Sequence, residues 1–168
     1  IYSQIMSKVD HTIAISKTVK DYIISTYNLS EDQITTIPRG CDSEVFNKDE
    51  LSSLWLNEWF KEYPQTKNKI ILTLPTRISE WKSVDSFIDL IANINSNDFH
   101  GLVVGPTSKS KEKYLTKLIR KVSNHNIEDK ITFTGSRNDI ANVYKLSDVV
   151  FNLSIKPEPF GRTTIEAI

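Results

Sequence analysis

Two cationic side chains, Arg77 and Lys82, stand five positions apart in a loop that follows an apolar run ending at Leu74. An arginine fork grips two phosphate oxygens, whereas a lysine supplies a movable point charge. Together they suit a diphosphate, whose negative charge must be neutralised as it leaves. Surface cations are plentiful, and taken alone the pair fits a solvated loop with a salt bridge to Glu80 better than it fits a ligand site.

Two carboxylates near the end of the chain form a second candidate site. Glu158 and Glu166 are separated by seven residues, with Phe160-Gly161 between them and a helix expected directly afterwards. The N-terminus of a helix attracts anions, and glycine lets a ligand approach the backbone. Glu158 could accept hydrogen bonds from sugar hydroxyls, and Glu166, about one turn inside the helix, could reach ribose hydroxyls. Stabilisation of the helix dipole would also explain Glu158, but it leaves the Pro-Phe-Gly segment unexplained.

The elements that must position these residues follow from hydrophobic periodicity, which alternates between strand-like and helix-like from residue 69 onward. Strands are expected over 69–74, 101–104, 130–133 and 148–153. Intervening helices are expected to bury three apolar faces: Val84, Phe87, Ile88 and Ile91; Leu115, Leu118, Ile119 and Val122; Ile140, Val143 and Tyr144. This order predicts an α/β fold with a Rossmann-like parallel sheet covered by helices on both faces.

Smaller features complete the expected layout. Ser136 with Asp139 resembles a capping box that opens the last complete helix. The polar residues 65–69 are interpreted as a linker. Upstream, short strands are expected at 13–15 and 34–37, on either side of a helix.

Ligands of such sheets bind beyond the carboxyl ends of the strands, in loops that here begin near Pro75, Gly105, Gly135 and Ser154. Gly105 offers backbone N–H groups, and the segment from Gly135 to Arg137 could serve a nucleobase edge. Plain turns explain both segments at least as well, because neither carries a dinucleotide fingerprint or a P-loop.

Composition limits the classes of function. The chain has 168 residues, 39% of them hydrophobic, with 21 basic and 21 acidic side chains, which is typical of one soluble domain and gives no reason to expect nucleic acid as a partner. No apolar run approaches the roughly 18 residues of a membrane-spanning helix. The single cysteine, Cys41, excludes an intramolecular disulfide and fits a reducing cytoplasm. Since the chain begins at Ile1 and stops inside an expected helix, we interpret it as part of a longer protein.

Segments along nearly the whole chain, taken in order, resemble those of the retaining glycosyltransferase family 4, whose fold is called GT-B. Glu158 to Glu166 is similar to the family's E-x7-E signature, and Arg77 with Lys82 matches its diphosphate-gripping pair in order and spacing. The other similar segments are Ile13 to Lys17, Ile34 to Asp42, Ile131 to Gly135 and Tyr144 to Asp148.

The resemblance implies roles for these positions. Arg77, Lys82 and Glu158 would be the catalytic residues, with the two cations on the donor diphosphate and Glu158 on the transferred sugar. The remaining donor-binding positions would be Gly105, Gly135, Arg137, Phe160, Gly161, Arg162, Thr163 and Glu166. Of these, Glu166 would bind the ribose and the segment ending at Arg137 would face the base. Residues 1–45 would end an N-terminal acceptor lobe, and residues 46–168 would form the donor lobe, incomplete at its C-terminus.

The resemblance also implies partners and conditions. The donor would be a UDP-, GDP- or ADP-linked sugar, used with retention of anomeric configuration and without a metal or other cofactor. The acceptor would be a glycan or lipid-linked sugar, in glycan or cell-surface polysaccharide biosynthesis. The protein would be cytoplasmic, with peripheral contact at the inner face of the membrane left open. This chain alone would be inactive, because catalysis in this fold occurs between two lobes.

Some positions depart from the family pattern, and two alternatives remain. Thr76 and Ser83 stand where the family usually has glycine. Another GT-B enzyme, such as a sugar-nucleotide epimerase or a phosphorylase, would share the sheet and phosphate loops, although Glu158 with Phe160-Gly161 favours transfer. A non-enzymatic signalling module of the receiver type would need acidic residues after its first strand, where this chain has Arg77.

Overall fold

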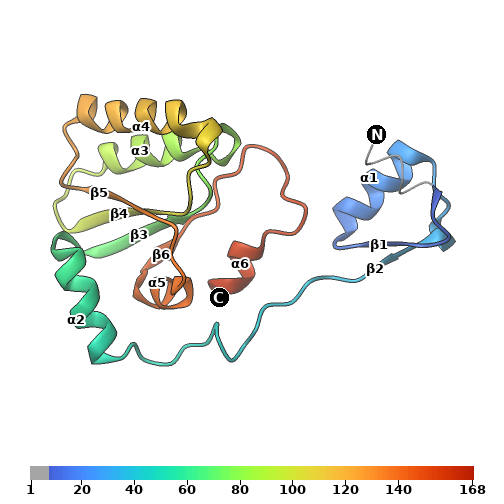
Figure 1. Cartoon of the computed structure of the whole chain (residues 1–168), viewed down its shortest axis with the longest axis horizontal. Helices are drawn as coiled ribbons and strands as arrows, with labels where there is room; N and C mark the ends of the chain where they lie inside the picture. Colours follow the sequence, from blue (N-terminus) through green and yellow to red (C-terminus); the bar gives the residue numbers. More distant parts are fainter. Residues whose placement is uncertain (1–7) are drawn as a thin grey trace.

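The computed structural model describes residues 8–168, which form a larger lobe and a smaller N-terminal unit joined by an extended segment (Figure 1). The larger lobe contains a parallel sheet with the strand order β5-β4-β3-β6. Its strands are β3 (Ile70–Pro75), β4 (Phe99–Val104), β5 (Ile131–Gly135) and β6 (Val149–Val150). The expected parallel α/β topology is confirmed.

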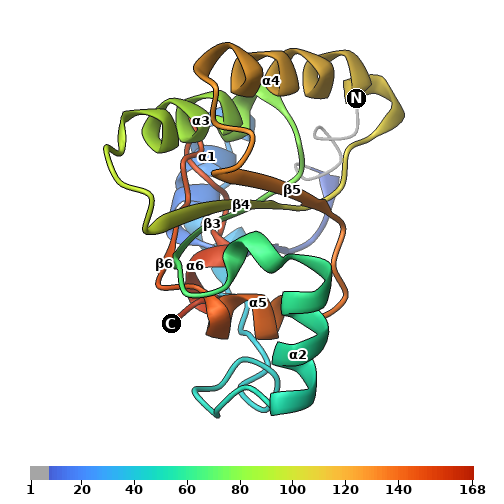
Figure 2. The same cartoon turned by 90° about the vertical axis from the view of Figure 1, so that its left-hand side faces the viewer.

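Helices cover both faces of this sheet, as expected (Figure 2). On one face lie α3 (Val84–Asn93) and α4 (Glu112–His125), and on the other lie α2 (Ser53–Glu62) and α5 (Ile140–Leu146). Successive strand residues face opposite sides, so Leu72 and Val103 pack under α3 and α4 whereas Ile71 and Leu102 pack under α2 and α5. The short helix α6 (Arg162–Glu166) ends the lobe, and the 3-10 turns η3 (Pro64–Thr66), η4 (Glu80–Lys82) and η5 (Lys109–Lys111) complete it.

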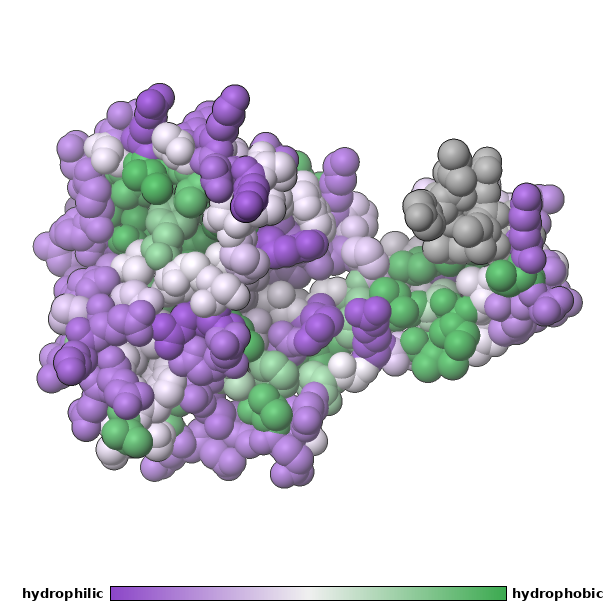
Figure 3. All heavy atoms as spheres, viewed as in Figure 1, coloured by the Kyte–Doolittle hydropathy of each residue, from purple (hydrophilic) through white to green (hydrophobic). Residues whose placement is uncertain are grey.

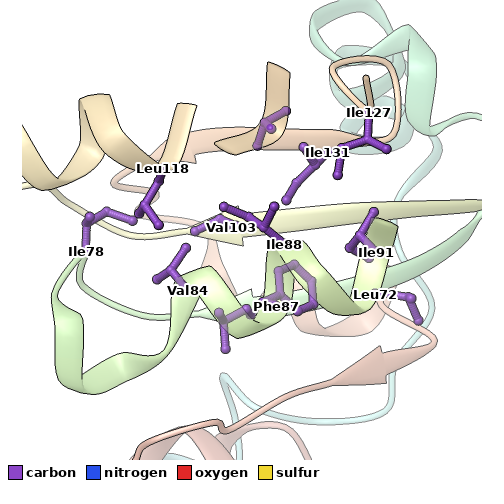
Figure 4. Close-up of a cluster of buried hydrophobic side chains, with 12 residues drawn as sticks. Leu72, Ile78, Val84, Phe87, Ile88, Ile91, Val103, Leu118, Ile127 and Ile131 are labelled. Atoms are coloured by element: carbon purple, nitrogen blue, oxygen red, sulfur yellow. The ribbon is translucent and has the colours of Figure 1, made fainter. Parts of the chain in front are cut away.

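The larger core lies between the sheet and α3 (Figure 4). Val84, Phe87, Ile88 and Ile91 are all buried, as their helical spacing predicts. The expectation for α4 was partly wrong, because Leu118 and Val122 are buried but Ile119 is 50% exposed. The buried stripe of α4 is therefore narrower than the sequence indicated.

Three other local expectations were wrong. The strand β6 holds two residues instead of six, because its pairing with β3 ends at Val150. Residues 65–69 are no free linker, since Thr66 is buried and accepts a hydrogen bond of 2.9 Å from Trp59 Nε1. Ser136 does not cap α5; Asp139 occupies that position, and its carboxylate binds other side chains instead of the helix backbone.

The N-terminal unit is a small β-α-β arrangement. It consists of β1 (Thr12–Ala14), α1 (Lys17–Tyr27), the turn η2 (Glu31–Gln33) and β2 (Ile34–Thr36), with β1 and β2 parallel. Ala14, Ile23, Leu29 and Ile34 form its core. Ile13 is 61% exposed, and Figure 3 shows hydrophobic surface on this unit. The predicted division near residue 45 falls within the extended segment between this unit and α2.

Candidate functional site

The carboxyl ends of the four strands bring the candidate residues to one edge of the sheet, where backbone hydrogen bonds join the loops. Thr76 N donates to Val104 O at 2.7 Å, and Gly105 N donates to Gly135 O at 2.8 Å. The loop after β6 is joined through Ile155 N, which donates to Trp81 O at 3.0 Å. These bonds fix the loops relative to one another before any ligand arrives.

An open pocket of about 430 Å³ lies beyond the ends of β3, β4 and β5. Five residues of the predicted set line it: Arg77, Gly105, Arg137, Arg162 and Glu166. The pocket therefore gathers predicted residues from loops that are far apart in the sequence.

Lys82 and Glu158 form a second group beside this pocket. Lys82 comes from η4, after β3, and Glu158 comes from the loop after β6, and their side chains form an ion pair with 15% and 22% of each exposed. Ser154 Oγ accepts a hydrogen bond of 3.1 Å from Lys82 Nζ and itself donates to Glu158 Oε1. The ammonium also lies 4.2 Å from the centroid of the Trp81 ring. Two of the three predicted catalytic residues are thus in direct contact.

The charge of Glu158 depends on opposing effects. Burial would raise the pKa of its carboxyl group, but hydrogen bonds from Lys82 and Ser154, with the charges of Lys82 and Arg77, hold that pKa below its usual value. Glu158 is therefore a carboxylate at neutral pH.

Arg77 differs from Lys82 in its exposure and in its contacts. It is exposed, and within residues 8–168 its guanidinium has no hydrogen bond or ion pair. Its charge nevertheless acts on Glu158, whose pKa it lowers. A guanidinium without a protein partner is available to an incoming anion.

Arg137, which is expected to face a nucleobase, is held by protein groups. Its fork donates to both carboxylate oxygens of Asp139, at 2.8 and 2.7 Å, and to Glu62 Oε2 at 3.0 Å. The guanidinium lies 5.2 Å from the Trp59 ring and 5.8 Å from the Tyr63 ring. Hydrogen bonds to Asp139 raise the pKa of Arg137 and lower that of Asp139. Arg137 therefore ties α2 to the loop after β5, and lines the pocket from that position.

Glu166 and Arg162 are paired with each other on α6. Arg162 Nη2 lies 2.6 Å from Glu166 Oε1, and Tyr144 donates its hydroxyl to Glu166 Oε2 at 3.4 Å. The Glu166 side chain is 10% exposed and that of Arg162 is 64% exposed. Burial and the neighbouring Glu166 raise the pKa of Tyr144. The guanidinium of Arg162 thus points at the Glu166 carboxylate.

The glycines of the predicted site differ in what they do. Gly105 has φ +154°, and a Cβ there would lie 2.0 Å from Thr76 O, so close approach of two loops requires this glycine. Its N–H is already bonded to Gly135 O, contrary to the expectation that it would be free for a ligand. Gly135 (φ +71°) has open space around it, and Gly161 (φ +76°) directs the chain from Phe160 into α6. Thr163, in the first turn of α6, is half-buried.

Within the part of the chain that the structure describes, no three His, Cys, Asp or Glu side chains lie close enough to hold a metal ion. No helix among residues 8–168 has the length and apolar character needed to cross a membrane.

Comparison with known families identifies the family to which this chain belongs. Residues 57–168 match the family described as Glycosyl transferases group 1. The chain belongs to this family. Residues 1–45 match a second description, Glycosyltransferase Family 4. The resemblance drawn from the sequence motifs is confirmed, and membership of a glycosyltransferase family excludes the receiver-type signalling module.

Two named relatives align with most of the chain. Mannosylfructose-phosphate synthase from Agrobacterium fabrum is 29% identical over an aligned length of 167 residues, and the alignment covers 95% of this chain and 36% of that protein. N-acetyl-alpha-D-glucosaminyl L-malate synthase from Bacillus anthracis is 27% identical over 136 residues, 80% of this chain and 33% of that protein. The chain thus spans about a third of the length of these relatives.

Solved structures show the same fold. A glycosyltransferase from Rickettsia africae has a TM-score of 0.88 and 30% identity, over 99% of this chain and 44% of its own. The Anabaena protein HepE has a TM-score of 0.84 and 23% identity, over 95% of this chain and 42% of its own. These likenesses confirm the expected GT-B architecture for the group 1 chain.

Two residues of this group 1 chain that the sequence did not single out contact the loop around Glu158. Ser154 bridges Lys82 and Glu158, and the available signal was its position directly after the strand expected over 148–153. Ser16, in the N-terminal unit, caps α1 and also donates its hydroxyl to Pro159 O at 2.5 Å. The second contact links residues 143 positions apart, so no local pattern could have indicated it.

Proposed function

We propose that the protein containing this chain transfers a sugar from a nucleoside-diphosphate sugar to an acceptor, with retention of anomeric configuration, and that this chain carries the donor site. The observation that carries the proposal is the convergence of Arg77, Lys82 and Glu158 at one edge of the sheet. Two cations suit a leaving diphosphate, and a neighbouring carboxylate suits the hydroxyls of the sugar attached to it. Family membership supports the same reading.

The proposed roles follow from these contacts. Arg77 and Lys82 bind the diphosphate and stabilise the charge that develops on it as the glycosidic bond breaks. Glu158 accepts hydrogen bonds from the sugar, and the backbone from Phe160 to Thr163 lies near sugar and phosphate. Glu166 accepts hydrogen bonds from the ribose. Because side-chain cations neutralise the leaving group, we propose that the reaction needs no metal.

The identities of sugar, base and acceptor are not fixed by the relatives. One is named for mannosylfructose phosphate and the other for an N-acetylglucosaminyl malate, so the two names differ in both sugar and acceptor. HepE was solved with UDP and with UDP-glucose, which makes UDP the first nucleotide to test. A glycan or lipid-linked acceptor, a role in polysaccharide biosynthesis and a cytoplasmic location with peripheral membrane contact belong to the same proposal.

A thermal-shift screen against UDP-, GDP- and ADP-sugars tests the donor site. A ligand that binds only the folded state at about 100 times its Kd adds about 2.7 kcal/mol of stability and raises the Tm by several degrees. We expect one nucleotide series to do so. No shift with any of the three would contradict the proposal.

Product analysis separates transfer from the chemistry of other GT-B enzymes. The intact protein, containing both lobes, is incubated with the nucleotide sugar that the screen selects, and proton NMR reads the anomeric configuration of the product. We expect a glycoside with the anomeric configuration of the donor. A free epimerised nucleotide sugar, or cleavage by inorganic phosphate, would identify an epimerase or a phosphorylase instead.

A further inference from the structure

The ammonium of Lys82 is occupied in the ligand-free structure. It contacts Glu158 Oε1, donates to Ser154 Oγ at 3.1 Å and lies 4.2 Å from the centroid of the Trp81 ring. An ammonium group has three N–H donors, so these partners engage most of what Lys82 can offer. A diphosphate that binds Lys82 must replace at least one of them.

Glu158 is the partner that a diphosphate would displace most readily. Ser154 is neutral and the Trp81 ring has no competing charge, whereas Glu158 is a carboxylate that would repel a second anion at the same ammonium. Both side chains of the ion pair are largely buried, at 15% and 22% exposed, so water screens this repulsion weakly.

We propose that Glu158 and the donor diphosphate compete for Lys82, so that arrival of the diphosphate releases Glu158 toward the transferred sugar. The inference rests on the proposed function and adds a coupling to it. Arg77 has no side-chain partner within residues 8–168 and therefore binds the diphosphate first. In the second step, the ammonium of Lys82 exchanges the Glu158 carboxylate for a phosphate oxygen. Ser154 is bonded to both members of the pair before this exchange.

The competition predicts opposite effects for the two members of one ion pair. Glu158→Gln keeps the shape of the side chain and frees Lys82, so we expect the Kd of a nucleoside diphosphate to fall by about fivefold, the scale of a partly buried ion pair. Lys82→Gln removes the contested cation, and we expect the Kd to rise by about tenfold. Titration calorimetry with UDP, GDP or ADP, whichever the wild type binds most tightly, measures both.

A double-mutant cycle separates competition from simple charge repulsion. If Glu158 acts by occupying Lys82, the gain from Glu158→Gln disappears in a Lys82→Gln background. If Glu158 only repels phosphate through space, the gain persists unchanged in that background, and this result would overturn the proposal. An unchanged Kd for Glu158→Gln alone would overturn it as well.

A matched control removes one carboxylate charge from η4, the turn that carries Lys82, and leaves Glu158 in place. Glu80 is ion-paired with Lys111 at 2.7 Å and is 58% exposed, so Glu80→Gln changes the net charge without freeing Lys82. We expect no tightening from this variant, and tightening equal to that of Glu158→Gln would count against competition. Failure of the proposed function gives a different result, because Arg77→Ala and Lys82→Gln would then bind the diphosphate as wild type does.

Discussion

Arg77 and Lys82 reach the same edge of the sheet in different electrostatic states. Arg77 is exposed and free of protein partners within the described residues, whereas Lys82 is ion-paired with Glu158 and rests on Trp81. A diphosphate could therefore bind Arg77 without breaking any contact within the protein. It could bind Lys82 only by replacing Glu158 as its partner. The two cations of this site should not contribute equally to binding.

Ser83 adopts a backbone conformation that glycine takes more readily than serine. It has φ +53° and ψ +41°, in the left-handed region, and it is the N-cap residue between Lys82 and the first residue of α3. A non-glycine residue there costs about 1–2 kcal/mol, partly offset by the greater freedom of glycine in the unfolded chain. We expect Ser83→Gly to raise the free energy of unfolding by about 0.5–1 kcal/mol in urea denaturation.

Ser108→Gly is the matched control for this prediction. Ser108 is exposed and has φ −76°, so glycine relieves no strain there and we expect no gain in stability. Equal stabilisation by both variants would show that the backbone at Ser83 is not the cause.

His100 gives a pH dependence at the scale of one residue. It is 1% exposed and bonded to Thr132 Oγ1 at 2.8 Å, and burial lowers its pKa to about 4 from the usual 6.5. Between these values the unfolded chain binds more protons than the folded chain, so stability falls as the pH falls. The loss from this group reaches up to about 3 kcal/mol at pH 4.

Comparison of wild type with His100→Gln isolates this effect. Glutamine can keep a hydrogen bond with Thr132 and does not titrate in this range. We expect urea denaturation at pH 7.5 and pH 4.5 to show a smaller loss of stability in the variant. Equal losses in both proteins would contradict a neutral, buried His100.

At the scale of elements, the sequence predicted what periodicity and strand order determine. Alternating strands and amphipathic helices predicted the parallel sheet, and the sheet in turn predicted the edge that gathers Arg77, Lys82 and Glu158. The ion-pair and hydrogen-bond partners of each side chain could not be predicted in this way. The ion pair of Arg137 with Asp139 and Glu62 depends on how α2 packs beside the loop after β5, which no local pattern records.

The loops after β3 and β4 depend on one glycine for their contact. A Cβ at Gly105 would lie 2.0 Å from Thr76 O, and φ +154° is unfavourable for other residues. We expect Gly105→Ala to lower the free energy of unfolding by about 3 kcal/mol or more, since backbone must move to accommodate it. The shift of Thr76 would also displace Arg77 and weaken diphosphate binding.

Two other glycines serve as controls that separate the effect of the close contact from that of backbone strain. Gly135 has open space but φ +71°, so Gly135→Ala should cost about 1 kcal/mol. Gly40 has open space and is exposed, so Gly40→Ala should change stability by less than about 0.5 kcal/mol. The same urea denaturation measures all three, and equal costs would show that the approach of Thr76 is not what requires Gly105.

At the scale of the whole molecule, the N-terminal unit contacts the loop that carries Glu158. Ser16 donates its hydroxyl to Pro159 O, next to Glu158, and Cys41 Sγ lies 3.7 Å from Ile165 O on α6. The segment between Glu158 and Glu166 is thus contacted both by the N-terminal unit, through Ser16, and by the extended segment that follows it, through Cys41. A change in the position of the N-terminal unit would therefore reach Glu158 through its neighbour Pro159.

The measurement that bears most directly on the donor site is calorimetric titration of a nucleoside diphosphate into wild type, Arg77→Ala, Lys82→Ala and Lys113→Ala. Lys113 is an exposed cation on α4 and removes the same charge away from the sheet edge. We expect each site variant to raise the Kd by about tenfold or more and Lys113→Ala to leave it nearly unchanged. Wild-type affinity in Arg77→Ala and Lys82→Ala would contradict a diphosphate site at this edge.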